Sequence, residues 1–153
     1  EWCDGPLLLS GAIGNGAAIL AAQAMGADLA YIGSIFIATE EANAADNYKQ
    51  AVVDSGASDI VYSNLFTGVH GNYLRSSIAA AGMDPDNLPS SDPSSMNFAE
   101  KTDNSKTRGA KPWKDIWGSG QGIGAVKAVL PAHQRIDQLK QEYQSARQRL
   151  LAQ

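Results

Sequence analysis

The sequence predicts an α/β fold built on parallel strands, and three features near its start support this. A short continuous apolar run, Leu7 to Leu9, is typical of a strand buried on both faces of a parallel sheet. A glycine-rich turn, Ser10 to Gly16, comes next, and an alanine-rich helix is expected over residues 17–25. A second strand is expected over residues 29–32, which completes a strand–helix–strand unit.

Turns of small residues follow both predicted strands. The first turn, SGAIGNG, contains three glycines in seven residues, and Gly33–Ser34 opens the second. Glycine permits a tight turn and lets a ligand approach main-chain N–H groups. Two neighbouring strand ends of this kind, with a helix N-terminus, can form a cradle for an anion. The spacing fits equally well an ordinary crossover whose glycines serve packing alone.

The chain then continues with further predicted elements. A helix is expected over residues 40–55, where apolar residues recur every three or four positions. A strand is expected over residues 59–66 and a short helix over residues 76–82. Between them lies TGVHGNYL, in which His70 has glycines close on either side. Such a histidine is either a general acid–base or a loop residue that is hydrogen-bonded or solvated.

The second half of the chain contains an irregular stretch. Residues 83–104 combine proline with serine, aspartate and asparagine, so we expect no regular structure there. The basic residues over 101–114 are expected to form a solvated surface patch rather than a phosphate site.

A second glycine-rich stretch, WKDIWGSGQGIG, runs from Trp113 to Gly124. It fits a dinucleotide fingerprint poorly, because no apolar strand precedes it and no acidic residue follows at the right distance. Its glycines could simply form a flexible turn. Trp113 and Trp117, four residues apart, are expected to anchor a core.

The final helix is expected to open at Pro131, a position that proline tolerates in the first turn. It presents one apolar stripe, which we expect to dock on the rest of the protein. The stripe consists of Ala132, Ile136, Leu139, Tyr143, Ala146 and Leu150. His133 is expected to be polar surface.

Composition excludes several classes of protein. The net charge is −4 without a basic stripe, so a nucleic-acid partner is not expected. No apolar run approaches the roughly 18 residues of a membrane helix, and no signal peptide is seen. A lone cysteine, Cys3, forms no internal disulfide and fits a reducing, cytoplasmic location. No cluster of histidine, cysteine and carboxylates has the spacing of a metal site.

SGAIGNG followed by ADLAYIGSIFIAT resembles strands seven and eight of the nitronate monooxygenase family, also called 2-nitropropane dioxygenases. The resemblance implies the C-terminal part of a (β/α)8 TIM-type barrel, with a small extra domain and a long C-terminal helix. It also implies FMN as the cofactor. The implied phosphate contacts are Gly11, Ala12, Gly33 and Ser34, where Ala12 replaces the family's second glycine and Ser34 its threonine. The GSGQG segment resembles the family's loop over the flavin, which implies cofactor contacts at Gly120, Gln121 and Gly122.

The same resemblance implies three parts: a βαβα portion of the FMN-binding barrel over residues 1–58, an extra domain over 59–130 and an amphipathic helix over 131–153. A full barrel needs about 250 residues. We therefore expect the N-terminal half of the barrel in a missing segment or another chain, and this chain alone to be inactive. The implied reaction oxidises alkyl nitronates with O2 to a carbonyl compound and nitrite, and a homo-oligomer is possible.

The family's catalytic base is a histidine upstream of strand seven, outside this chain. His70 could approach the cofactor or substrate, but the proton transfer is not assigned to it. Two other enzymes share the same cradle: a flavin-dependent enoyl reductase and an IMP dehydrogenase-type barrel. TGVHGNYL and the tryptophan–glycine loop favour the nitronate enzymes. A non-catalytic half-barrel that serves association is the alternative outside catalysis.

Overall fold

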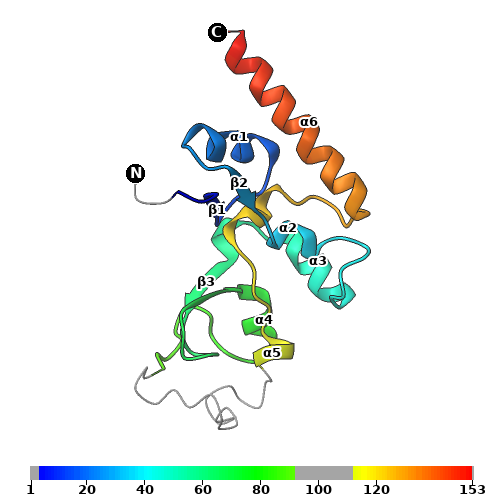
Figure 1. The fold of residues 1–153 in the computed structure, drawn as a ribbon. Coiled ribbons are helices and arrows are strands. Elements are labelled where there is room, and N and C mark those ends of the chain that lie inside the picture. The colour runs from blue at the N-terminus through cyan, green and yellow to red at the C-terminus, as the bar shows by residue number, and fades with distance from the viewer. Residues whose placement is uncertain (1–3, 92–111, 153) are drawn as a thin grey trace. The chain divides into compact units, whose positions relative to one another are not determined.

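A computed structural model describes residues 4–91 and 112–152, and for Pro112 and Trp113 only the backbone (Figure 1). The chain divides into two compact units. Residues 1–57 and 121–153 form the first, and residues 58–120 form the second. Among the described helices, none is both long and apolar enough to cross a membrane. The predicted α/β class is confirmed.

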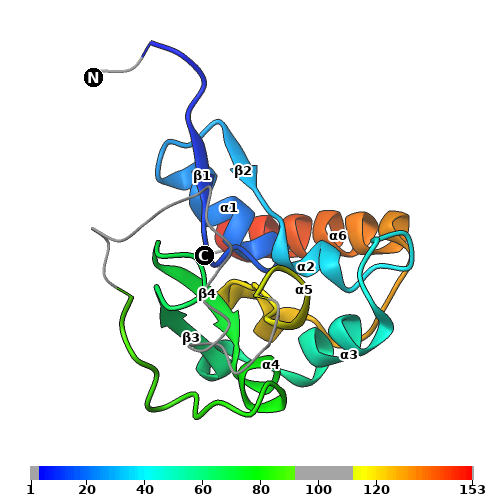
Figure 2. The same ribbon diagram turned by 90° about the horizontal axis from the view of Figure 1, so that it is seen from below.

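The first unit begins with the predicted strand–helix–strand order: β1 (Leu8–Ser10), α1 (Gly16–Ala24) and β2 (Leu29–Tyr31). The two strands are parallel and lie side by side (Figure 2). Asn15 begins α1, because its side chain accepts a hydrogen bond from the Ala18 N–H at 2.8 Å. After α1 the chain turns at Gly26, whose φ of +96° favours glycine.

The sheet is covered on one side only. Leu9 of β1 and Ala30 of β2 pack against a core of Ile13, Ala22 and Ala27. On the other side Leu8 and Leu29 are 52% and 56% exposed. The prediction that these strands are buried on both faces is therefore wrong for the described residues. Their parallel sheet contains only β1 and β2, and α1 covers one face.

The helix predicted over residues 40–55 begins later, as α3 (Asp46–Asp54), after a short helix α2 (Ser34–Ile37). Residues 39–41 make long-range contacts instead. Thr39 bridges Leu130 in parallel, and the Glu40 N–H donates to the Leu130 carbonyl at 3.1 Å. The Glu41 carboxylate accepts from the Ala132 N–H at 2.8 Å. These partners lie about ninety positions away in the sequence, so helical periodicity could not reveal them.

The single-turn helix η3 (Gln121–Ala125) packs against α2 and α3, and it leads to the long helix α6 (Ala132–Leu151). α6 crosses α1 at Gly16, where an added Cβ would lie 2.2 Å from the Leu139 carbonyl oxygen.

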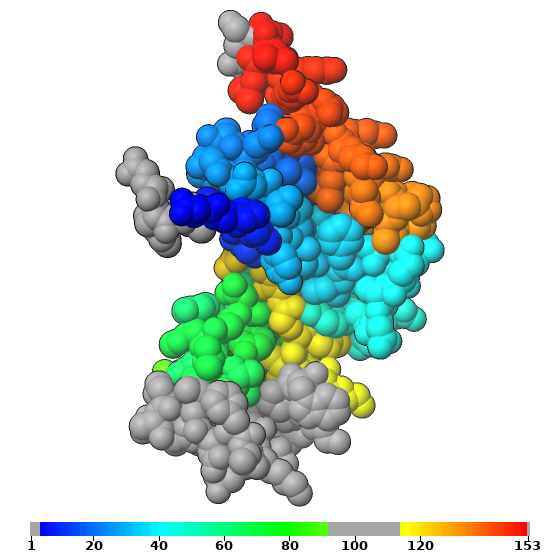
Figure 3. Space-filling view, viewed as in Figure 1, coloured from blue at the N-terminus to red at the C-terminus, as the bar shows by residue number. Residues whose placement is uncertain are grey.

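The predicted apolar stripe of α6 is only partly correct. Leu139 and Ala146 are buried, whereas Ile136 and Leu150 are 42% and 61% exposed. The last turns of α6, red in Figure 3, extend beyond its contact with α1. Arg135 is buried instead, and its guanidinium donates to the Ala128 carbonyl at 2.8 Å and to the Gln138 amide oxygen at 2.9 Å.

The second unit contains an antiparallel pair, β3 (Ile60–Ser63) and β4 (Gly71–Leu74). The short helix η1 (Ala57–Asp59) lies at its boundary, and α4 (Arg75–Ala80) and α5 (Pro112–Asp115) complete the elements described there. Its core is a cluster of large apolar side chains. The buried members are Leu65, Phe66, Ile78, Met83 and Ile116.

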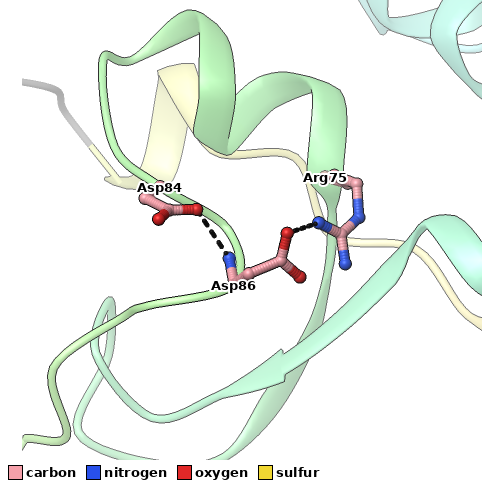
Figure 4. A network of polar contacts seen from close by, with 3 residues as sticks. All are labelled: Arg75, Asp84 and Asp86. Atoms are coloured by element: carbon pink, nitrogen blue, oxygen red, sulfur yellow. Dashed lines mark hydrogen bonds and ion pairs between the residues drawn. The ribbon is translucent and has the colours of Figure 1, made fainter.

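Polar contacts fix the chain after α4 and the segment after α5. Arg75 forms an ion pair with Asp86 at 2.7 Å, and the Asp86 N–H donates to the Asp84 carboxylate (Figure 4). This pairing holds the pKa of the Asp86 carboxyl below its ordinary value. Trp117 is half-buried and donates its indole N–H to the Lys114 carbonyl. The Trp113 side chain, Cys3 and most of the basic stretch lie outside the described residues.

Candidate functional site

The parallel register of β1 and β2 brings the two predicted turns together. Ser10 is the register partner of Tyr31, so the turn at Gly11–Ala12 and the turn at Gly33–Ser34 leave the same edge of the sheet. Residues more than twenty positions apart in the sequence therefore emerge beside one another.

The glycines of the unit fall into two groups. A Cβ added to Gly11 or Gly33 would meet no heavy atom within 4 Å, and both residues are exposed. By contrast, a Cβ on Gly14 would lie 2.1 Å from the Gly122 carbonyl oxygen, and Gly16 lies against α6. The packing explanation therefore accounts for Gly14 and Gly16, but not for Gly11 and Gly33.

Ala12 adopts a backbone conformation that favours glycine. Its φ is +54°, and that of the preceding Gly11 is +102°. A left-handed conformation costs an L-residue roughly 1–2 kcal/mol, and such strain persists where neighbouring structure enforces it. The two positive φ values turn the chain sharply between β1 and α1.

Gly122 of the predicted flavin loop meets this turn within the first unit. Gln121 is exposed, while a Cβ on Gly122 would lie 3.1 Å from the carbonyl carbons of Ala12 and Ile13. Gly120 is the last residue of the second unit. Just before it, the N–H of buried Ser119 donates to the Asn72 carbonyl at 3.1 Å, which attaches this segment to β4.

Sequence reasoning missed the support of α1 from the C-terminal helix. The Glu142 carboxylate accepts from the Gly16 N–H at 2.8 Å and from the Gln138 amide at 2.8 Å. Burial lowers the pKa of the Arg135 guanidinium, and the charge of Glu142 opposes this shift. No local signal could reveal Glu142, because it lies 126 positions from Gly16.

His70 lies in the second unit. It is exposed and stacks on Tyr62, with ring centroids 4.7 Å apart and an interplanar angle of 19°. In the described parts of the chain, histidine, cysteine, aspartate and glutamate form no group of three that could hold a metal ion.

Two solved bacterial proteins share this α/β architecture. A FabK mutant from Thermotoga maritima matches with a TM-score of 0.71 at 21% identity, over 98% of this chain and 46% of that one. A nitroalkane oxidase from Streptomyces ansochromogenes matches with a TM-score of 0.67 at 27% identity, over 97% of this chain and 42% of that one. The first likeness shows the fold alone.

Sequence similarity identifies the family. Residues 3–142 match the nitronate monooxygenase family, and the chain belongs to it. A nitronate monooxygenase from Paraburkholderia phytofirmans is 26% identical over 151 residues, which are 97% of this chain and 40% of that protein. A probable nitronate monooxygenase from Staphylococcus haemolyticus is 36% identical over 63 residues, or 41% of this chain and 18% of that protein. The chain thus spans less than half the length of these relatives.

Proposed function

We propose that this chain carries the FMN-phosphate cradle of an enzyme that oxidises alkyl nitronates with O2 to a carbonyl compound and nitrite. The observation that supports the cradle is the pair of adjacent turns whose glycines, Gly11 and Gly33, face open space. Family membership and the likeness to a nitroalkane oxidase support the class of reaction.

The proposed phosphate contacts are main-chain groups. Gly11, Ala12, Gly33 and Ser34 would present N–H donors, and a dianion accepts such donors strongly. The absence of a Cβ at Gly11 and Gly33 leaves room beside these amides. Backbone donors also suit a chain with a net charge of −4, because they need no basic side chain.

The flavin ring is proposed to meet the loop at Gly120 and Gln121. Gln121 belongs to the unit that carries both turns, and its exposed side chain is open to a ligand. FMN, when bound, supplies the redox chemistry, and the residues of this chain bind and orient it. The proton-handling histidine is proposed to lie upstream, and His70 is not assigned that role.

We further propose that this chain is the C-terminal part of a (β/α)8 barrel whose remaining strands extend the β1–β2 pair. Leu8 and Leu29 leave apolar surface exposed, as do Leu7 and Tyr31. Parallel sheets are normally buried on both faces, so additional strands and helices would cover these side chains. They would belong to the same polypeptide or to another chain.

The cradle can be tested with a charge placed at its rim. Gly33 has a φ of −121°, which any residue adopts, so Gly33→Asp adds a carboxylate without backbone strain. We expect Gly33→Asp to lower FMN affinity at least about tenfold, which corresponds to about 1.4 kcal/mol, as measured by flavin absorbance.

The controls are Gly33→Ala, which adds a Cβ in open space, and Gly5→Asp, which places the same charge at another open glycine. Both should retain FMN. Equal retention by Gly33→Asp would refute the cradle, and colourless wild-type protein that refuses FMN would favour the association module. Nitrite release from an alkyl nitronate, measured on the protein with the remaining barrel strands present, tests the reaction separately.

A further inference from the structure

Gly14 and Gly122 meet backbone to backbone in the first unit. A Cβ added to Gly14 would lie 2.1 Å from the Gly122 carbonyl oxygen. In return, a Cβ of Gly122 would lie 3.1 Å from the carbonyl carbons of Ala12 and Ile13. No real Cβ tolerates the first distance, and the second requires the neighbouring backbone to shift. We call this contact the glycine joint.

Glycine is required at this contact, but not throughout the glycine-rich segment. Gly124, two residues further along η3, would place a Cβ 3.8 Å from the nearest heavy atom, the Ala57 nitrogen. That distance is ordinary van der Waals contact. Neither Gly122 nor Gly124 has a positive φ, so alanine suits the backbone of both. The two positions differ in what a methyl group would meet.

We propose that Gly122 is a positioning residue, which holds the turn after β1 in its left-handed conformation through the glycine joint. Ala12 is strained at a φ of +54°, and strain of this kind persists only when adjacent structure enforces it. Gly122 is adjacent to this residue, since a Cβ added to Gly122 would lie 3.1 Å from the Ala12 carbonyl carbon. The joint thereby fixes the direction of the Gly11 and Ala12 amides.

This inference rests on the proposed function for its ligand and revises the role of one residue. Gly122 supports the backbone of the phosphate turn rather than contacting the flavin itself. Loss of the joint should therefore weaken binding of the phosphate group more than binding of the ring. FMN and riboflavin, which differ only in that phosphate, separate the two contributions.

The experiment compares Gly122→Ala with its matched control Gly124→Ala. Binding of FMN and of riboflavin is measured for each variant, with a urea melt to establish folding. We expect Gly122→Ala to reduce the FMN-to-riboflavin affinity ratio about tenfold, the loss of roughly one charge-assisted hydrogen bond. Gly124→Ala should keep the wild-type ratio. A merely structural defect would weaken both ligands equally, and an unchanged ratio in Gly122→Ala overturns the proposal.

A measurement without ligand tests the glycine joint independently of the proposed phosphate cradle. The amides of Gly16 and Ala18 are hydrogen-bonded just beyond the turn, so their hydrogen exchange reports its order. Gly122→Ala should speed this exchange and Gly124→Ala should not. If no flavin binds wild-type protein, the proposed function fails, yet this exchange difference still supports the joint. Equal exchange in both variants overturns it.

Discussion

Removal of the Glu142 carboxylate tests the link between the two ends of the chain. Glu142 accepts from the N–H of buried Gly16 and from the Gln138 amide, both at 2.8 Å. Glu142→Ala leaves the Gly16 N–H without its acceptor, which costs about 1–3 kcal/mol. It also removes a negative charge from a helix N-terminus, worth about 0.3–1 kcal/mol. Together these lower the expected free energy of unfolding by about 1–4 kcal/mol.

Glu142→Gln sharpens this prediction. Glutamine keeps one acceptor oxygen and exchanges the other for a donor, so only one of the two hydrogen bonds survives. The expected loss is about 1–2 kcal/mol, between wild type and Glu142→Ala.

Urea denaturation followed by circular dichroism measures all three proteins, with Gln144→Ala as the control on the exposed face of the same helix. The control should stay within about 0.5 kcal/mol of wild type. A loss for Glu142→Ala no larger than that of the control would refute the reasoning, because the cap would then be a solvated contact.

Two further predictions concern α6 and the segment before α3. Leu139→Ala should lower the unfolding free energy by about 2–3 kcal/mol in urea melts, because Leu139 is buried. Leu150→Ala should cost under about 0.5 kcal/mol, because Leu150 is exposed. Equal losses in the two variants would contradict the buried face of the helix. The hydrogen bond from the Ala132 N–H lowers the pKa of the Glu41 carboxyl below its ordinary 4.5. Glu41 therefore stabilises the fold above pH 4.5, and this contribution is lost as the pH falls through the lowered pKa. Glu41→Gln should be less sensitive to acid over that window, and an identical pH profile in urea melts would count against the contact.

The sequence by itself determined the elements whose causes are local. The apolar run before SGAIGNG and the alanine-rich segment after it predicted β1, α1 and β2 within a residue or two. The cap of α1 is local in the same sense, because Asn15 accepts from an N–H only three residues away. The residues that carry the family resemblance lie in the same region, and family membership is now established.

Only the tertiary structure decided which contacts the same residue types make. SGAIGNG contains three glycines that look alike in sequence, yet Gly11 faces open space, Gly14 meets Gly122 and Gly16 meets α6. Likewise, Leu139 is buried where α6 crosses α1, whereas Ile136 of the same predicted stripe is exposed. The physical reason is one of range: periodicity and capping express interactions over about four residues, whereas a close approach of two backbones depends on segments that meet only after folding.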